Sequence, residues 1–141
     1  MKKEPLFIAF STQKGGAGKT TLTMLMASYL YYVKGYDVAV VDCDYPQFSL
    51  KDMRERDLKN IERNPHLRRA AYEQFKRLGK RAYPIVGSRP DHAVEAARPF
   101  VESETPPDFV FFDLTGTVNN MGLIKTVATM DYIFCPIAAD R

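Results

Sequence analysis

The order of patterns in the first third of the chain constrains its fold most. An uninterrupted apolar run, Leu6–Phe10, ends in a glycine-rich turn, and apolar residues then recur with helical spacing over residues 22–33. After Gly35, a glycine where a helix commonly ends, a second apolar run follows at Val38–Val41. Continuous apolar runs are typical of strands buried on both faces of a parallel sheet. The sequence therefore predicts a βαβ unit, right-handed by the general rule for such connections. The predicted apolar face of its helix consists of Leu22, Leu25, Met26, Tyr29, Leu30 and Val33.

The rest of the chain continues this alternation of strand and helix. Helical spacing predicts helices near 48–62 and 65–79, separated at Asn64-Pro65, and two more that begin after Pro90 and near residue 119. Short apolar runs predict three further strands, at Tyr83–Val86, Phe109–Phe112 and Tyr132–Cys135. The first of these contains Pro84, which favours a place at the sheet edge. The pattern predicts an α/β fold with a mostly parallel sheet.

Composition limits the class of protein. The chain has 141 residues, of which 45% are hydrophobic, and a net charge of +3, which fits one domain with a real core. No apolar run approaches the roughly 20 residues that cross a bilayer, and no signal peptide is apparent. Cys43 and Cys135 lie in apolar stretches, so we expect both to be buried, reduced thiols of a cytoplasmic protein.

Charge is concentrated in the middle of the chain. Residues 51–81 hold eleven Lys or Arg and five Asp or Glu, a local net charge of +6 against −3 for the rest. A solvated helical face is the ordinary interpretation of such a segment. Binding to nucleic-acid phosphates is the alternative, although no recognition motif accompanies the charge. We expect Tyr72 and Phe75 to belong to the core and not to a stacking surface.

The segment Lys14-Gly15-Gly16-Ala17-Gly18-Lys19-Thr20-Thr21 has the composition of a phosphate-binding loop. Its glycines allow successive backbone N–H groups to point at an anion, and the helix that follows adds its positive end. Lys19 is placed to reach β- and γ-phosphates, and the Thr20 hydroxyl to bind Mg²⁺. The ordinary phosphate-loop motif has a glycine where this chain has Gln13. The alternative to a phosphate-binding loop is a glycine-rich turn with two solvated lysines. The residues expected to bind the nucleotide here are Gly15, Gly16, Ala17, Gly18, Lys19, Thr20 and Thr21.

Acidic residues end two of the predicted strands. Asp42 and Asp44 follow the second strand, and Asp113 follows the fourth. Ligands of α/β sheets gather at the carboxyl ends of the strands, where such a carboxylate can hold Mg²⁺ or orient a water molecule. Asp113 also opens a D-x-x-G pattern, so the Gly116 N–H is a candidate donor to the γ-phosphate. A turn-forming or helix-capping role is the alternative for Asp113, and ordinary loop acids after a strand are the alternative for Asp42 and Asp44.

The loop Lys14–Thr21 resembles the deviant Walker A box of the ParA/MinD ATPases, a branch of the P-loop NTPases that also holds nitrogenase iron protein and arsenite-pump ATPases. Across the whole chain, the sequence looks most similar to the ParA-like TraA proteins encoded with conjugative transposons. The resemblance implies a three-layer P-loop NTPase-like domain with a basic helical insertion at about 48–80. Members of the family continue well past the fifth strand. We therefore expect this chain to be the N-terminal part of a longer domain, which would bind nucleotide weakly and hydrolyse it poorly by itself.

The resemblance also implies an activity and assigns roles. ATP and Mg²⁺ would be the cofactors, and ATP would form a homodimer in which Lys14 reaches the partner's phosphates. The sequence from Asp42 to Gln47 is similar to the family's D-x-D-P-Q box, except that Tyr45 intervenes before the proline. By that similarity Asp44 would position the attacking water, while Asp42, together with Thr20 and Asp113, would support Mg²⁺.

The implied work is DNA partition or positioning, or transfer of a conjugative element. Nonspecific DNA and an activator protein would be the partners, and no amphipathic tail indicates a membrane. Two alternatives remain open at this stage. One is a nucleotide-binding switch or scaffold without turnover. The other is a different enzyme on the same loop: an ATP-dependent ligase, for which no substrate pocket is legible in the sequence, or a reductase, for which the cysteines are poorly placed.

Overall fold

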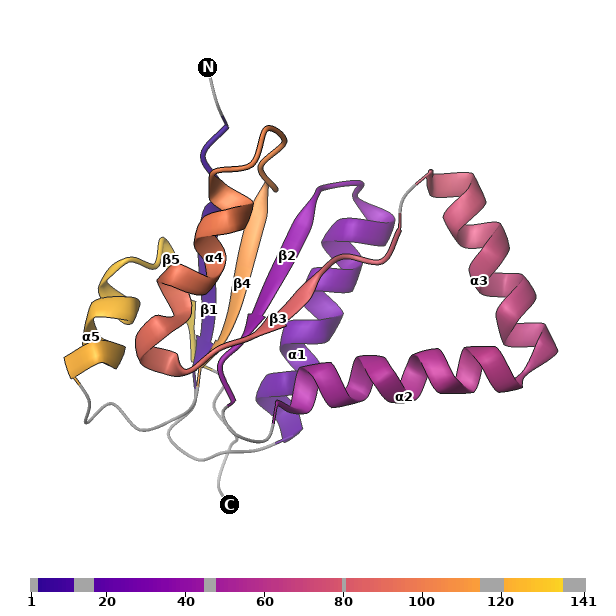
Figure 1. Ribbon diagram of the computed structural model, residues 1–141, viewed down its shortest axis with the longest axis horizontal. Coiled ribbons are helices and arrows are strands. Elements are labelled where there is room, and N and C mark those ends of the chain that lie inside the picture. The colour runs from indigo at the N-terminus through magenta and orange to yellow at the C-terminus, as the bar shows by residue number, and fades with distance from the viewer. Residues whose placement is uncertain (1–2, 12–16, 45–47, 80, 115–120, 136–141) are drawn as a thin grey trace.

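The computed structural model describes residues 3–11, 17–44, 48–79, 81–114 and 121–135. Their centre is a five-stranded sheet of the order β3-β2-β4-β1-β5 in which every pairing is parallel (Figure 1). The predicted α/β architecture is confirmed, and β3, which follows Pro84, lies at one edge. The strands are β1 (Leu6–Ser11), β2 (Val38–Asp42), β3 (Ile85–Gly87), β4 (Phe109–Leu114) and β5 (Tyr132–Phe134).

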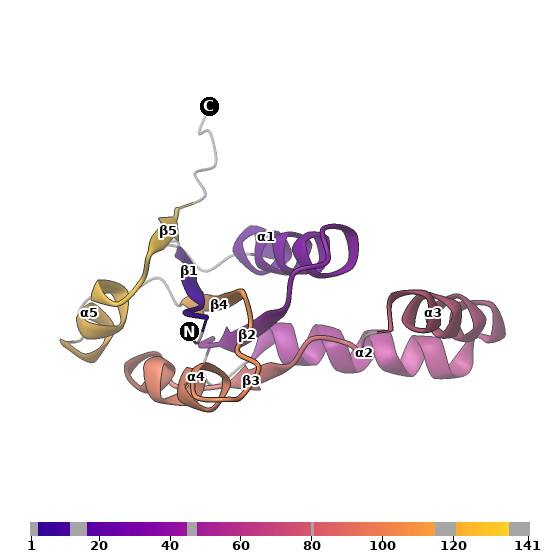
Figure 2. The same cartoon turned by 90° about the horizontal axis from the view of Figure 1, so that it is seen from above.

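Helices cover both faces of the sheet and make the expected three layers. α1 (Ala17–Ser28), extended by a π-helical turn at Tyr29–Val33, covers one face, whereas α4 (Ala93–Val101) and α5 (Met121–Ala128) cover the other (Figure 2). Gly35 follows the π-helical turn with a φ of +79°, a left-handed conformation that side chains disfavour. This glycine therefore allows the chain to leave the helix and enter β2.

The core has two halves because successive strand residues point to opposite faces. In β2, Val38 and Val40 pack on the α1 side, while Ala39 and Val41 pack on the α4 side. The central strands are apolar at consecutive positions because both of their faces are covered. Full burial of each such valine or phenylalanine side chain stabilises the fold by about 1.5–3 kcal/mol.

The predicted apolar face of α1 was right for Met26 and Leu30, which pack against the core, and wrong for its other four residues. The helix turns its small residues Thr23 and Ala27 to the sheet, and Leu25 on the opposite side is 63% exposed. Lys19 and Thr20 lie in the first turn of α1 and reach Asp113 on β4, which fixes how the helix is rotated. Leu22, Leu25, Tyr29 and Val33 are consequently exposed.

Two other burial predictions were also wrong. Cys135 is exposed, because it follows β5, an edge strand whose three residues are all exposed. Tyr72 is 65% exposed, because its helix packs mainly against one other helix and leaves most of its circumference in solvent. Cys43 is buried, as expected.

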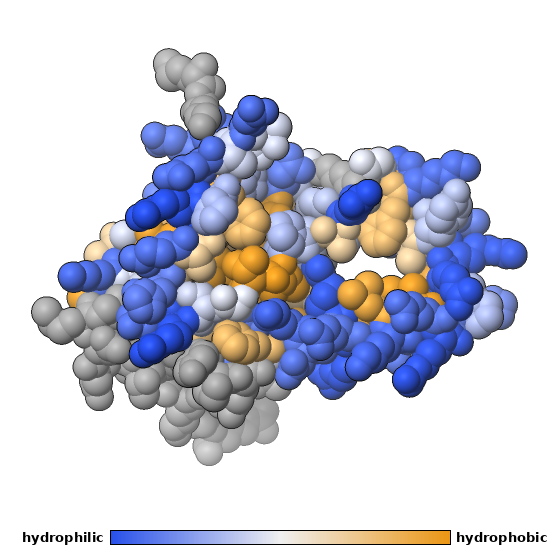
Figure 3. Space-filling model, in the orientation of Figure 1, coloured by the Kyte–Doolittle hydropathy of each residue, from blue (hydrophilic) through white to orange (hydrophobic). Residues whose placement is uncertain are grey.

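Two helices form an arm that projects from the layers beyond β3 (Figure 1). The helical arm consists of α2 (Ser49–Arg63) and α3 (Pro65–Leu78), in agreement with the predicted helices and with the break at Asn64-Pro65. The Asn64 side chain accepts hydrogen bonds from the backbone amides of His66 and Leu67 at 2.9 and 3.3 Å. In Figure 3, hydrophilic residues cover the outer edges of the arm and hydrophobic ones line the hollow between the arm and the sheet layers.

The N-cap of α3 generates a first prediction. Asn64→Ala removes the acceptor for two amides and is expected to destabilise α3 by about 1 kcal/mol. Hydrogen exchange of the α3 amides measures this effect, which we expect as faster exchange confined to the arm. Asn60→Ala, in the interior of α2, is the matched control and should leave exchange unchanged or slower, because alanine favours helix. Equal exchange rates in the two variants would contradict the capping role.

Candidate functional site

Two carboxylates lie side by side at the carboxyl ends of the central strands. Asp42 on β2 is in register with Asp113 on β4, and Asp113 is in register with Phe10 on β1. Residues in register on parallel strands face the same side of a sheet, and Phe10 packs in the α1-side core. Both carboxylates therefore project on the α1 side, and both are fully buried.

The first turn of α1 supplies the partners of Asp113. Lys19 Nζ lies 3.0 Å from Asp113 Oδ1 and donates a 2.6 Å hydrogen bond to the carbonyl oxygen of Leu114. The Thr20 hydroxyl donates to Asp113 Oδ2 at 3.3 Å. Only 4% of Lys19 is exposed, so its charge is neutralised inside the protein and not by solvent. Lys19, Thr20 and Asp113 thus form one buried cluster. The first is the predicted phosphate ligand, and the other two are predicted Mg²⁺ ligands.

Burial dominates the electrostatics of Asp113. Desolvation raises its pKa, and the charge of Lys19 opposes that rise. Asp113 Oδ1 approaches Lys19 as an ion pair but lacks a well-aligned hydrogen-bond donor. The compensation of Asp113 Oδ1 therefore comes from its 3.0 Å ion pair with Lys19.

Asp42 has a different set of partners, all of them backbone amides. Its Oδ2 accepts hydrogen bonds from the N–H groups of Leu50 and Lys51 at 3.0 and 3.2 Å, and its Oδ1 accepts from Asp44 N–H at 3.1 Å. Burial raises the pKa of Asp42, and these amides oppose the rise. Asp42 therefore holds the first turn of α2 against the sheet, and its predicted support of Mg²⁺ stays a prediction.

Asp44 also contacts the start of α2. Its Oδ2 accepts a 2.7 Å hydrogen bond from the Ser49 hydroxyl, and its backbone carbonyl accepts from Phe48 N–H. Unlike Asp42, Asp44 is partly exposed and so can reach a solvent molecule. Sequence analysis missed Ser49. A serine at the first position of a helix that follows an acidic loop is the signal that points to it.

The described residues fit a phosphate and Mg²⁺. A buried lysine at a helix N-terminus suits an anion, and a threonine hydroxyl beside a carboxylate supplies the hard oxygen ligands that Mg²⁺ prefers. Among the described residues no three His, Cys, Asp or Glu side chains cluster as a complete metal site. That is the expectation for Mg²⁺, which is usually held by one or two carboxylates, waters and substrate phosphates.

The remaining predicted site residues are placed only in part. Ala17 and Gly18 open α1, and Thr21 is exposed. Lys14, Gly15, Gly16 and Gly116 lie outside the described residues. Their predicted roles stay predictions.

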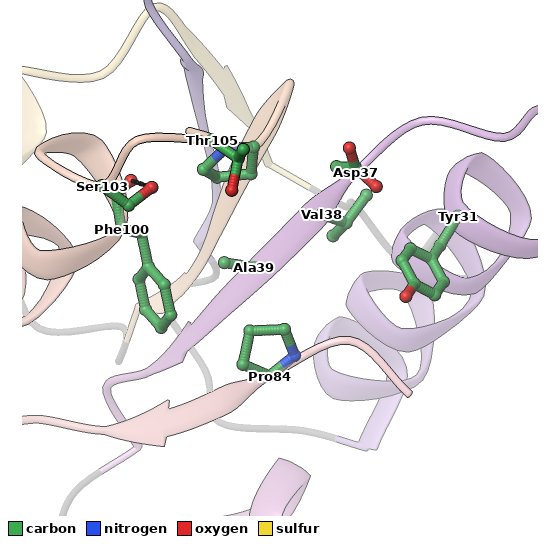
Figure 4. A pocket seen from close by; sticks show the side chains of 9 residues that line it. Tyr31, Asp37, Val38, Ala39, Pro84, Phe100, Ser103 and Thr105 are labelled. Carbon is green, nitrogen blue, oxygen red and sulfur yellow. Dashed lines mark hydrogen bonds between the residues drawn. The ribbon is translucent and has the colours of Figure 1, made fainter. Parts of the chain in front are cut away.

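A pocket of about 180 Å³ lies at the other end of the sheet (Figure 4). Val38, Pro84, Phe100, Ser103 and Thr105 are among the residues that line it. Val38 begins β2, whereas the carboxylate of Asp42 is at its end, so this pocket is separate from the buried cluster.

Comparison with known proteins agrees with this geometry. The sequence profile of the CobQ/CobB/MinD/ParA nucleotide binding domain matches residues 8–133. A protein of Borreliella burgdorferi, described as "Uncharacterized protein BBD21", is 57% identical over 42 residues, which are 30% of this chain and 16% of that protein. The chain thus covers a small part of that relative's length. Among the described helices, none is both long and apolar enough to span a membrane.

The contacts of Asp42 generate a second prediction. Asp42→Ala leaves three backbone amides without their acceptor and is expected to lower the free energy of unfolding by about 1–3 kcal/mol. Urea denaturation measures the change. Asp44→Ala is the control, because it removes the Ser49 contact from a partly exposed carboxylate and should cost less. A cost for Asp42→Ala no larger than that of the control would contradict the anchoring role.

Proposed function

The chain belongs to the CobQ/CobB/MinD/ParA nucleotide-binding family, and from that premise we propose that it binds ATP with Mg²⁺ and hydrolyses it as an ATP-dependent homodimer. The observation that carries the proposal is the buried cluster of Lys19, Thr20 and Asp113 at the N-terminus of α1. This cluster lies at the carboxyl ends of the strands, where α/β sheets bind ligands.

Each residue of the cluster has a proposed part in binding. Bound Mg²⁺ would neutralise phosphate charge and polarise the γ-phosphoryl group. When nucleotide binds, the Lys19 ammonium group would leave Asp113 and the Leu114 carbonyl and would contact phosphate oxygens instead. Its buried charge would therefore remain compensated. Thr20 and Asp113 would then hold Mg²⁺ through their oxygens, with Asp42 supporting the same region from β2.

Two residues are proposed to act on the reaction itself. Asp44, held by Ser49 and partly exposed, would orient the attacking water. Lys14 would reach the phosphates bound by the partner subunit, where an added cation stabilises the charge of phosphoryl transfer. In the cell, we propose work in DNA partition or positioning, or in transfer of a conjugative element, with DNA and an activator protein as partners.

Nucleotide binding gives the third prediction. Lys19→Ala should abolish measurable ATP binding, and Lys19→Gln, which keeps a donor near Asp113, should weaken it by at least about tenfold because a charge-assisted hydrogen bond is lost. Calorimetric titration with Mg-ATP measures the affinity, and circular dichroism verifies folding. Lys34→Gln, at an exposed lysine beyond α1, is the matched control. Wild-type affinity in folded Lys19→Gln would contradict the assignment.

Hydrolysis gives the fourth prediction. Measured on a protein that carries the whole family domain, Asp44→Ala should retain ATP-driven dimers, seen by light scattering, while turnover falls by about 10²–10⁴-fold because the water is no longer oriented. Normal turnover in this variant would contradict the role of Asp44. If that whole-domain protein binds ATP but hydrolyses none, with or without DNA, a nucleotide-controlled switch or scaffold replaces the ATPase as the function.

A further inference from the structure

The basic charge of the helical arm is concentrated on α3. α2 has five basic and four acidic residues, so its charges nearly cancel. α3 has four basic residues and one acidic residue, Glu73. The basic residues of α3 are Arg68, Arg69, Lys76 and Arg77. The positive potential of the arm therefore comes chiefly from α3.

One side of α3 carries two of these charges together with an aromatic ring. Arg69, Tyr72 and Lys76 are spaced three and four residues apart, so they share one side of the helix. All three are exposed, and no residue of α3 is buried. The half-buried Ala71 and Phe75 lie on the other side of the helix. Figure 3 shows hydrophilic residues along the outer edges of the arm.

We propose that the Arg69–Tyr72–Lys76 side of α3 binds the phosphate backbone of a nucleic acid. Arg69 and Lys76 provide the cations for two phosphates, and the tyrosine hydroxyl between them is a donor of the kind that contacts phosphate oxygens. The 14-residue helix is about 21 Å long and stands clear of the sheet layers, so it has the shape that the major groove of a duplex admits.

The same side of α3 is poorly suited to a membrane. An interfacial helix buries a broad apolar face in the lipid, whereas Arg69, Lys76 and Glu73 surround the one aromatic ring here.

This inference does not depend on the ATP site, so its test is made without nucleotide. Binding of the full chain to a short DNA duplex of mixed sequence is measured by fluorescence anisotropy over a range of salt concentrations. The double variant Arg69→Ala/Lys76→Ala should lower the slope of log affinity against log salt by about 1.8 and weaken binding roughly 60-fold at 0.1 M salt, since each phosphate contact contributes about 0.9 to the slope.

A matched control removes equal charge from the other helix. Arg56→Ala/Lys59→Ala takes two exposed cations from α2 and should change the affinity much less. Circular dichroism verifies that both double variants keep their helices. Tyr72→Ala should also weaken binding. Tyr72→Phe distinguishes duplex DNA from single-stranded DNA as the ligand. The loss of the hydroxyl impairs duplex binding, whereas stacking of the ring on single-stranded DNA is retained.

Three outcomes would overturn the proposal. The first is wild-type DNA affinity in the α3 double variant. The second is an equal loss in the α2 control, which would mean that net charge and not this side of α3 is responsible. The third is binding to polyglutamate or to anionic lipid vesicles in preference to DNA.

Discussion

The burial of two neighbouring carboxylates is the constraint on which the rest of the structure depends. Asp42 is the last residue of β2 and Asp113 is the last but one of the neighbouring β4, and neither has access to solvent. An unpaired charge in such a place costs several kcal/mol, so each carboxylate requires its own partners. Asp113 has a lysine and a hydroxyl from α1, and Asp42 has the amides of α2. The two helices are thus positioned by the charges that they compensate.

Local patterns account for the part of the fold that the sequence predicted. Continuous apolar runs identified the strands because both faces of the sheet are covered, and Asn64-Pro65 separated α2 from α3 because asparagine caps a helix that proline begins. Gly35 was identified because the chain needs a positive φ there. In each case the residues that decide the structure are neighbours in sequence, so no knowledge of tertiary contacts was needed.

Burial could not be predicted where the decisive partner is distant in sequence. The hydrophobic pattern of α1 favoured the side with Leu22 and Leu25, but the contact of Lys19 with Asp113, 94 residues later, rotates Thr23 and Ala27 to the sheet. Tyr72 was predicted to belong to the core, yet it is exposed because its helix packs mainly on α2. Asp42 and Asp113 lie together because parallel strands bring their carboxyl ends to one edge of the sheet, which the sequence pattern could predict. The contact of Asp44 with Ser49 depends on how α2 docks and could not be predicted in this way.

The arm and the candidate phosphate site are parts of one structure, not separate modules. The last residue of β2 accepts hydrogen bonds from the amides that begin α2, and Asp44 accepts another from Ser49 at the same point. Further along α2, Arg54 lies over the Tyr83 ring at 4.6 Å and donates to its backbone carbonyl, which fixes the direction in which the arm leaves the domain. Any displacement of Asp42 or Asp44 must therefore move the base of α2 or break these hydrogen bonds. A rigid helix of 15 residues carries a small rotation at its base to its far end, where α3 begins.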